Sequence, residues 1–255
     1  MDAQFEHTAL EIEEKMNSVG MTISQLIHFY SVRKSTLFNL STEQYRQFSY
    51  FYQLLVSQDY SKFTKGSLLE RISTILFQNS LFYVRNNCRT HTNELDLLIE
   101  WSDSSRLSLM NQVFSCFGDS FICECKNYSS AVSVTYVGKF FSLLRLAHVQ
   151  LGIMIAWEGV TGRNSWSDAE GLIRKIALSE HIFIVTVDQN DLQRIFEQQT
   201  NIFHLLMTSI MLFSTISIIA NIFNGILLRT NSSSLKHNIN IYMHRLFLCI
   251  SYARR

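Results

Sequence analysis

The sequence predicts an α/β protein in which a mixed central sheet is flanked by helices and preceded by an N-terminal helical region. Three observations predict this fold class. Apolar residues recur at three- and four-residue spacing through residues 1–60, β-rich runs alternate with amphipathic segments from Gly66 onward, and 47% of the 255 residues are hydrophobic. Such a chain can bury a full core, and strands separated by helices favour a mixed sheet with helices on both faces.

The expected elements follow from the periodicity of each segment. The first 60 residues indicate helices with breaks near Gly20 and Ser41. Strands are expected at 81–86, 94–101, 120–126, 151–157 and 181–187. Helices are expected at 65–79, 132–148 and 165–178, and a last one begins with the segment 191–198. Residues 102–119 form a serine-containing connection that is longer than a hairpin needs.

Charge and cysteine content narrow the function classes. A net charge of +1 provides no general attraction to nucleic acid, so contact with DNA has to come from local patches. The first residues lack a basic region followed by an apolar run, so we expect a cytoplasmic protein in a reducing compartment rather than a secreted one. Cys116, Cys123 and Cys125 lack a second ligand pair at zinc-site spacing, so buried free thiols are expected.

The stretch FICECKNY, residues 121–128, places two opposite charges on one face of an expected strand. Side chains alternate between the faces of a strand, so Glu124 and Lys126 project on one side, away from the apolar residues. A solvent-facing ion pair on an edge strand is the ordinary interpretation. The alternative is catalytic, because Asp96 lies in the preceding strand and Glu70 in the helix before it. Carboxylates suit Mg²⁺, and a nearby ammonium can stabilise charge during phosphodiester hydrolysis.

These residues belong to a series of motifs that resembles the PD-(D/E)xK nuclease superfamily, in particular its Mrr-like restriction endonuclease branch. The series spans about residues 65–195 in the order that the family requires. Its members are KGSLLE (65–70), NELDLLIE (93–100), FICECKNY (121–128), GIMIAWEGVTG (152–162) and SDAE (167–170). Leu95 stands where the motif name has proline, which is a common variation. The separation of Asp96 and Glu124 requires residues 102–119 to loop out.

The resemblance implies roles for four residues. Asp96 and Glu124 would be ligands of Mg²⁺, with Mn²⁺ as a substitute, Lys126 would be the catalytic lysine, and Glu70 would support the metal or its water. The implied function is a metal-dependent endonuclease that hydrolyses phosphodiester bonds of double-stranded DNA, in restriction or defence against foreign DNA. A non-cleaving DNA-binding or sensor protein on the same fold and a membrane-anchored nuclease-domain protein are the alternatives.

The resemblance also implies a domain organisation. A restriction-endonuclease-like domain at 63–200 would follow a helical region at 1–62 and precede a helical or membrane-associated extension at 201–255.

Other polar residues near the motifs have both a catalytic and a purely structural interpretation. Gln150 could lie near an active site or end a helix, and His91 and His148 could be general bases or solvated or capping residues.

Two segments outside the motifs suggest further contacts. Residues 22–40 either form a degenerate helix-turn-helix, in which Arg33 and Lys34 would open a DNA-binding recognition helix, or a plain helical cap. Residues 201–228 carry no charge and are long enough to span a bilayer. A polar stripe along them favours an amphipathic helix packed on the domain, or on the partner in a homodimer, over a membrane anchor.

Overall fold

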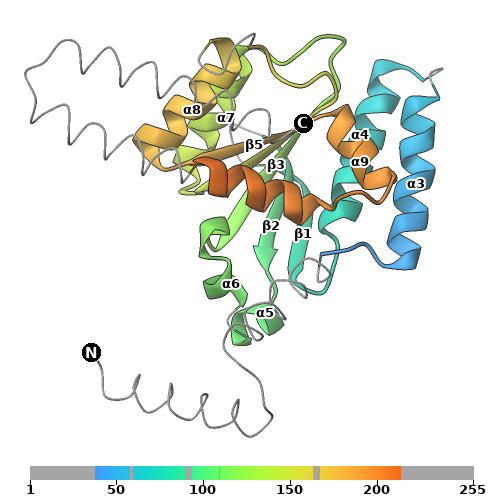
Figure 1. The fold of residues 1–255 in the computed structure, drawn as a ribbon, viewed down its shortest axis with the longest axis horizontal. Helices are drawn as coiled ribbons and strands as arrows, with labels where there is room; N and C mark the ends of the chain where they lie inside the picture. The colour runs from blue at the N-terminus through green and yellow to red at the C-terminus, as the bar shows by residue number, and fades with distance from the viewer. Residues whose placement is uncertain (1–37, 58–59, 90–93, 109, 163–166, 214–255) are drawn as a thin grey trace, which may run out of the picture. The chain divides into compact units, whose positions relative to one another are not determined.

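The computed structural model describes residues 38–57, 60–89, 94–108, 110–162 and 167–213 (Figure 1). The chain divides into two compact units, residues 1–39 and 40–255. The fold described below is that of the second unit. Arg33 and Lys34, the predicted helix-turn-helix residues, lie outside the described residues, so their DNA contact stays a prediction.

A mixed five-stranded sheet forms the centre of the second unit, as the sequence predicts. The strands are β1 (Phe82–Arg89), β2 (Glu94–Trp101), β3 (Ser120–Lys126), β4 (Leu151–Ala156) and β5 (Phe183–Val187). They lie side by side in chain order. The pairs β1–β2 and β2–β3 are antiparallel, whereas β3–β4 and β4–β5 are parallel. β3 is therefore the middle strand, with two neighbours on each side.

Helices cover the sheet on its flanks. They are α3 (Thr42–Val56), α4 (Lys62–Phe77), α7 (Val134–Leu146), α8 (Asp168–Glu180) and α9 (Gln189–Phe196). α4 packs against β1, β2 and β3, while α7 packs on β4 and α8 on β5. α3 lies on α4 and α9, where the ring centroids of Tyr52 and Phe196 are 4.9 Å apart. This arrangement confirms the predicted α/β fold class.

Two helices begin earlier than the periodicity predicts, because capping residues define their starts. The Ser61 side chain accepts a hydrogen bond from the backbone N–H of Thr64, so α4 begins at Lys62 rather than at residue 65. The Asp188 carboxylate accepts hydrogen bonds from the N–H groups of Asn190 and Asp191, so α9 begins at Gln189.

The connection between β2 and β3 loops out of the sheet, as the resemblance requires. It folds into the short helices α5 (Asp103–Leu107), α6 (Met110–Val113) and η1 (Ser115–Phe117). Trp101 holds its end, because its indole N–H donates to the Gly118 carbonyl at 2.8 Å and its ring stacks on Phe114 and Phe117. The two flanking strands can therefore pair directly.

A further helix, residues 202–213, packs on the same aromatic cluster. Phe203 contacts Phe114 and Phe117, with ring centroids 4.8 and 5.6 Å apart, and Phe213 stacks on Phe183 of β5. This agrees with the packed-helix interpretation for the described part of 201–228, whereas 214–228 lies outside the described residues. Among the described residues, no helix has both the length and the apolar character needed to cross a membrane.

Candidate active site

The candidate active site lies where β2 and β3 diverge. The last residues paired between these strands are Leu97 and Cys123. Beyond them, the backbone N–H of Cys125 donates to the Asp96 carboxylate, at 2.6 Å from Oδ2, instead of to a carbonyl of β2. A charge-assisted bond of this kind is stronger than a neutral one. It ties Asp96 to β3, between the positions of Glu124 and Lys126.

Glu124 and Lys126 form an ion pair in the middle of the sheet. The Lys126 ammonium donates to Glu124 Oε1, and the two side chains are only 16% and 20% exposed. Their strand continues to pair with β4 here, with Glu124 opposite Met154 and Lys126 opposite Ala156. The pair therefore lies on a central strand, so the ordinary interpretation as a solvent-facing pair on an edge strand does not hold.

The second carboxylate oxygen of Glu124 has no partner. Oε2 is buried and makes no hydrogen bond within the part of the chain that the structure describes. Burying a carboxylate oxygen without a partner is costly, so such an atom in a native site calls for a ligand.

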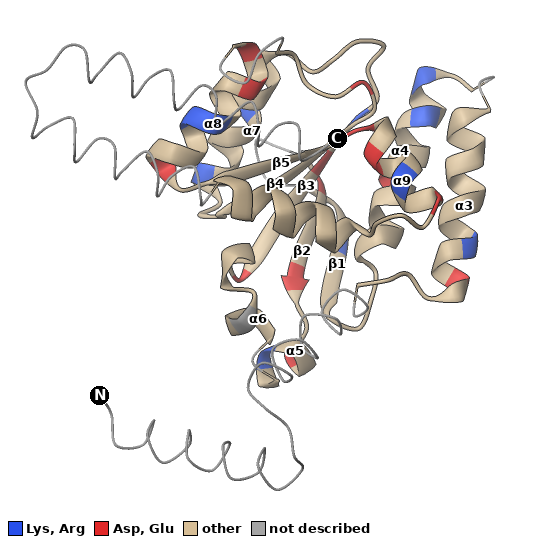
Figure 2. Ribbon diagram, viewed as in Figure 1, with Lys and Arg blue, Asp and Glu red and all other residues tan. Residues whose placement is uncertain are grey.

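The charges around Glu124 come from three elements. Burial raises the pKa of Glu124, the charge of Asp96 raises it further, Lys126 lowers it, and the charge of Glu70 raises it. Figure 2 shows how the acidic and basic positions are distributed over the helices and strands. The structure therefore brings together all four residues that the resemblance implicates: Glu70, Asp96, Glu124 and Lys126.

Lys126 stays protonated in this setting. Burial alone would lower the pKa of Lys126, but the charge and hydrogen bond of Glu124 and the charge of Asp96 raise it above its usual value. The ammonium is thus a fixed positive charge at neutral pH, suited to stabilising negative charge rather than to accepting a proton.

Glu70 is held near the strands by the packing of its helix. Ser73, on the next turn of α4, donates to the Leu69 carbonyl at 2.7 Å and lies 3.1 Å from the Cys125 sulfur. This contact joins the middle of α4 to the end of β3. The helix carboxylate therefore approaches the site from a different element than the strand residues do.

The donor chemistry fits a divalent metal. Carboxylate oxygens are hard ligands preferred by Mg²⁺, Glu124 has a buried oxygen without a hydrogen-bond partner among the described residues, and Asp96 is near enough for its charge to raise the pKa of Glu124. No set of three or more His, Cys, Asp and Glu side chains is arranged as a metal cluster among the described residues. Two carboxylates would therefore need further oxygen ligands, from the backbone and water, to complete the coordination of a divalent cation.

The structure separates other candidates from this site. Gln150 is exposed in the connection between α7 and β4, at the end of β4 opposite the Lys126 side, so it does not line the site, and α7 ends earlier, at Leu146. His148 follows α7 in the left-handed conformation (φ 55°), as a residue at a helix end does. His91 lies outside the described residues. Four described cysteines, Cys88, Cys116, Cys123 and Cys125, are free thiols.

Tyr128 is a residue near the site that the sequence reasoning missed. Its ring packs on Tyr136 of α7, with centroids 5.2 Å apart. Burial and its hydrogen bond with Tyr136 raise the pKa of Tyr128, whereas the charge of Lys126 lowers it. The sequence feature that could have identified Tyr128 is its position in FICECKNY, two residues after Lys126.

The mixed sheet, its flanking helices and the carboxylate–lysine motif on β2 and β3 are those of a restriction-endonuclease-like nuclease. Residues 63–196 match the Mrr catalytic family, whose description is restriction endonuclease. This match covers just over half of the chain, and the protein belongs to that family. Comparison with curated proteins finds no match.

Proposed function

We propose that the protein is a Mg²⁺-dependent endonuclease that hydrolyses phosphodiester bonds of double-stranded DNA. Membership of the restriction endonuclease family supports nuclease activity and a DNA substrate. The observation that carries the metal dependence is the buried Oε2 of Glu124, which has no hydrogen-bond partner among the described residues, on a carboxyl group whose pKa the nearby charge of Asp96 raises. Mn²⁺, which also prefers oxygen ligands, is expected to substitute for Mg²⁺.

Asp96 and Glu124 act as the acidic metal ligands in this proposal. A divalent cation held by them would offset charge on the scissile phosphate and lower the pKa of the attacking water. The hydrogen bond from Cys125 N–H orients the Asp96 carboxylate before the substrate arrives. Glu70 adds negative charge from α4 and positions the cation or its water.

Lys126 stabilises charge on the phosphate in this proposal and does not transfer a proton. Its raised pKa keeps the ammonium charged, and its bond to Glu124 holds the side chain within the site. A preformed positive charge stabilises the negative charge that develops on the phosphoryl oxygens in the transition state. The family of restriction endonucleases supports a role in defence against foreign DNA.

The test is cleavage of plasmid DNA by the purified full chain with Mg²⁺, with Mn²⁺ and with EDTA. Nicked or linear plasmid is expected with either metal and none with EDTA. Lys126→Ala protein that is purified by the same procedure serves as a control for contaminating nuclease. DNA binding without cleavage in Mg²⁺ would instead support the non-cleaving alternative, and equal cleavage in EDTA would refute metal dependence.

A further inference from the structure

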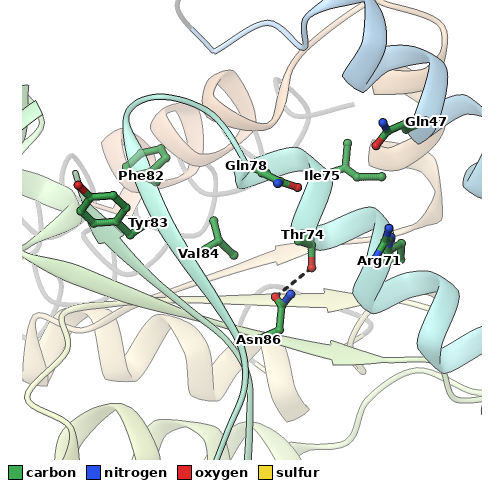
Figure 3. Close-up of a pocket in the computed structure, with 9 residues that line it drawn as sticks. All are labelled: Gln47, Arg71, Thr74, Ile75, Gln78, Phe82, Tyr83, Val84 and Asn86. Carbon is green, nitrogen blue, oxygen red and sulfur yellow. Dashed lines mark hydrogen bonds between the residues drawn. The ribbon is translucent and has the colours of Figure 1, made fainter. Parts of the chain in front are cut away.

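A polar cavity of about 430 Å³ lies between α3, α4 and the edge strand β1 (Figure 3). Arg71 of α4 and Asn86 of β1 are among its lining residues. Asn86 points toward α4, where its Oδ1 accepts a hydrogen bond from the Thr74 hydroxyl at 3.1 Å. The cavity therefore lies on the face of the sheet that α4 covers.

The candidate active site opens on the other face of the sheet. Cys125 of β3 faces α4, since its sulfur lies 3.1 Å from the Ser73 hydroxyl. Side chains alternate along a strand, so Glu124 and Lys126 project away from α4. The sheet thus separates the cavity from these two residues.

α7 packs on the face that carries Glu124 and Lys126. Met154 of β4 is the partner of Glu124, so Gly152, two residues before Met154, shares the face of Glu124. An added Cβ at Gly152 would lie 2.7 Å from Phe140 of α7, so α7 covers this face at β4. The chain reverses between α7 and β4, so the first turn of α7 lies toward the ends of β3 and β4, where Lys126 is.

Tyr128 joins this first turn to the end of β3. Its ring packs on Tyr136 of α7, with centroids 5.2 Å apart. The connection that follows Tyr128 is held at its far end, since Val132 pairs with Val160 and its N–H donates to the Gly159 carbonyl at 2.8 Å. Tyr128 is 38% exposed and Tyr136 is 40% exposed. Two fixed tyrosines thus keep part of their surface open to solvent beside the site.

The Tyr128 hydroxyl lies within range of the charges of the site. Burial and the hydrogen bond with Tyr136 raise the pKa of Tyr128. The charge of Lys126 lowers this pKa, and the charge of Glu124 raises it. The hydroxyl is protonated at neutral pH and is a hydrogen-bond donor. A tyrosine hydroxyl beside an ammonium is suited to contact a DNA phosphate.

Lys139 adds a positive charge to the same side of the site. It is exposed, one turn along α7 from Tyr136, and its ammonium lies 5.4 Å from the centroid of the Tyr136 ring. It makes no ion pair with a carboxylate in the described part of the chain. A lysine on an aromatic ring keeps N–H donors for a phosphate.

Tyr128 and Lys126 lie close enough to contact neighbouring phosphates. Two extended residues span at most about 7 Å, which limits the distance between their Cα atoms. Each strand of DNA carries one phosphate per roughly 3.4 Å of axis. A strand whose scissile phosphate lies at Lys126 therefore brings an adjacent phosphate to Tyr128.

We propose that Tyr128 and Lys139 contact the backbone of the DNA strand that is held in the active site. The Tyr128 hydroxyl donates to the phosphate next to the scissile one, Tyr136 holds the Tyr128 ring, and Lys139 supplies positive charge to the same part of the backbone. The inference rests on the proposed nuclease function, because it takes the position of the scissile phosphate from it.

The test measures binding of the full chain to a labelled DNA duplex at several salt concentrations, with Ca²⁺ in place of Mg²⁺. Tyr128→Phe keeps the ring and removes the hydroxyl. Its affinity should fall about tenfold, as the loss of one hydrogen bond to a charged group does, and its salt slope should not change. Lys139→Ala should reduce the slope of log K against log salt by roughly one, as the loss of one phosphate contact does.

Single-turnover cleavage in Mg²⁺ separates a contact in the ground state from one made only in the transition state. At saturating DNA the rate of Tyr128→Phe should fall by less than its affinity does, because a phosphate that does not react is bound in both states. A large fall in this rate with wild-type affinity would place the contact in the transition state, against the proposal.

Tyr50→Phe and Arg145→Ala are the matched controls. Tyr50 is an exposed tyrosine of α3, which packs on α4, and Arg145 is an exposed arginine on the last turn of α7, away from Lys126. Both should bind DNA with the affinity and salt slope of the wild type. Wild-type affinity of folded Tyr128→Phe, or a wild-type slope of Lys139→Ala, would overturn the proposal. Lys139 is exposed, so its variant gives this answer even if Tyr128→Phe does not fold.

Three further outcomes separate the inference from neighbouring explanations. Wild-type affinity of Tyr128→Phe with weak binding by folded Tyr128→Ala would assign the ring to stacking on a base, against the proposal. Wild-type cleavage with unchanged binding by Tyr128→Phe and Lys139→Ala would refute the contacts and leave the nuclease function standing. Weaker binding by both variants without any wild-type cleavage would refute the function and retain the contacts.

Discussion

Glu124 occupies a position that favours its neutral form although the proposed chemistry needs its carboxylate. Burial, Asp96 and Glu70 raise the pKa of Glu124, and Lys126 opposes them only in part. Because the folded-state pKa lies above the unfolded value, this group contributes stability that is fully present below the unfolded pKa of about 4.3. That contribution is lost as the pH rises through the folded-state pKa.

We therefore expect Glu124→Gln to be more stable than the wild type at neutral pH without metal. The substitution removes a buried charge that repels Asp96, so the thermal unfolding midpoint should rise at pH 7–8, and this gain should vanish near pH 4. Unfolding monitored by circular dichroism in EDTA across this range measures the difference. Glu158→Gln, at an exposed position, is the control. A lower midpoint for Glu124→Gln at pH 8 would mean that its pairing with Lys126 outweighs the repulsion.

The Asp96→Asn and Lys126→Ala variants should lose cleavage activity for different reasons. Asp96→Asn removes a ligand charge, so the stabilisation that Mg²⁺ provides to the folded state, about 2.7 kcal/mol at a hundredfold excess over Kd, should be lost together with cleavage. Lys126→Ala should keep metal and DNA binding but lose turnover by about a hundredfold or more, because the ammonium acts on transition-state charge. Unfolding with and without Mg²⁺ and single-turnover plasmid cleavage measure both effects. Near wild-type cleavage by folded Lys126→Ala would remove the catalytic assignment.

At the scale of elements, the close approach of α7 to β4 depends on Gly152. A Cβ at this position would lie 2.5 Å from Leu144 Cδ1 and 2.7 Å from Phe140 Cε1 of α7. Gly66 of α4 has the opposite surroundings, since nothing lies within 4 Å of its added Cβ. The same substitution at the two glycines should therefore have opposite effects.

Gly152→Ala should destabilise the protein by about 1–3 kcal/mol, as overpacking of a core does. Gly66→Ala should stabilise it by about 0.5–1 kcal/mol, because alanine loses less backbone entropy within a helix. Urea unfolding of both variants and the wild type measures these changes in the free energy of unfolding. A stabilised Gly152→Ala protein would show that α7 can move away from β4 without loss.

At the scale of the whole second unit, distant segments cover one aromatic cluster. Phe203 of the 202–213 helix meets Phe114 and Phe117 of the connection that loops out between β2 and β3. This packing covers the connection that must leave the sheet for Asp96 to reach β3. Stability of the sheet and the position of this helix are thus coupled.

Phe203→Ala should lower the free energy of unfolding of the full chain by about 3 kcal/mol, because it opens a cavity among buried rings. Met211→Ala on the same helix should change it by less than about 0.5 kcal/mol, since Met211 is 62% exposed. Denaturant unfolding of both variants gives the comparison. Equal, small effects would indicate that the helix contributes little to the folded domain.

The strands, the helices and the shared face of Glu124 and Lys126 could be predicted from the sequence, because these features depend on neighbours along the chain. Helix starts were displaced by two or three residues, since the caps Ser61 and Asp188 depend on side-chain geometry that periodicity does not encode. The resemblance named Glu70, Asp96, Glu124 and Lys126, and its roles for them stay proposals.

Sequence alone determined that an α/β domain carries two carboxylates and a lysine on consecutive strands, because alternation and motif order are properties of the chain itself. Only the tertiary structure decided that β3 is the central strand, that Asp96 accepts the Cys125 N–H and that Glu124 Oε2 is buried without a partner. The cavity beside Arg71 is likewise a product of three elements. Strand order, burial and cavities result from contacts between residues far apart in the chain, and no local pattern specifies them.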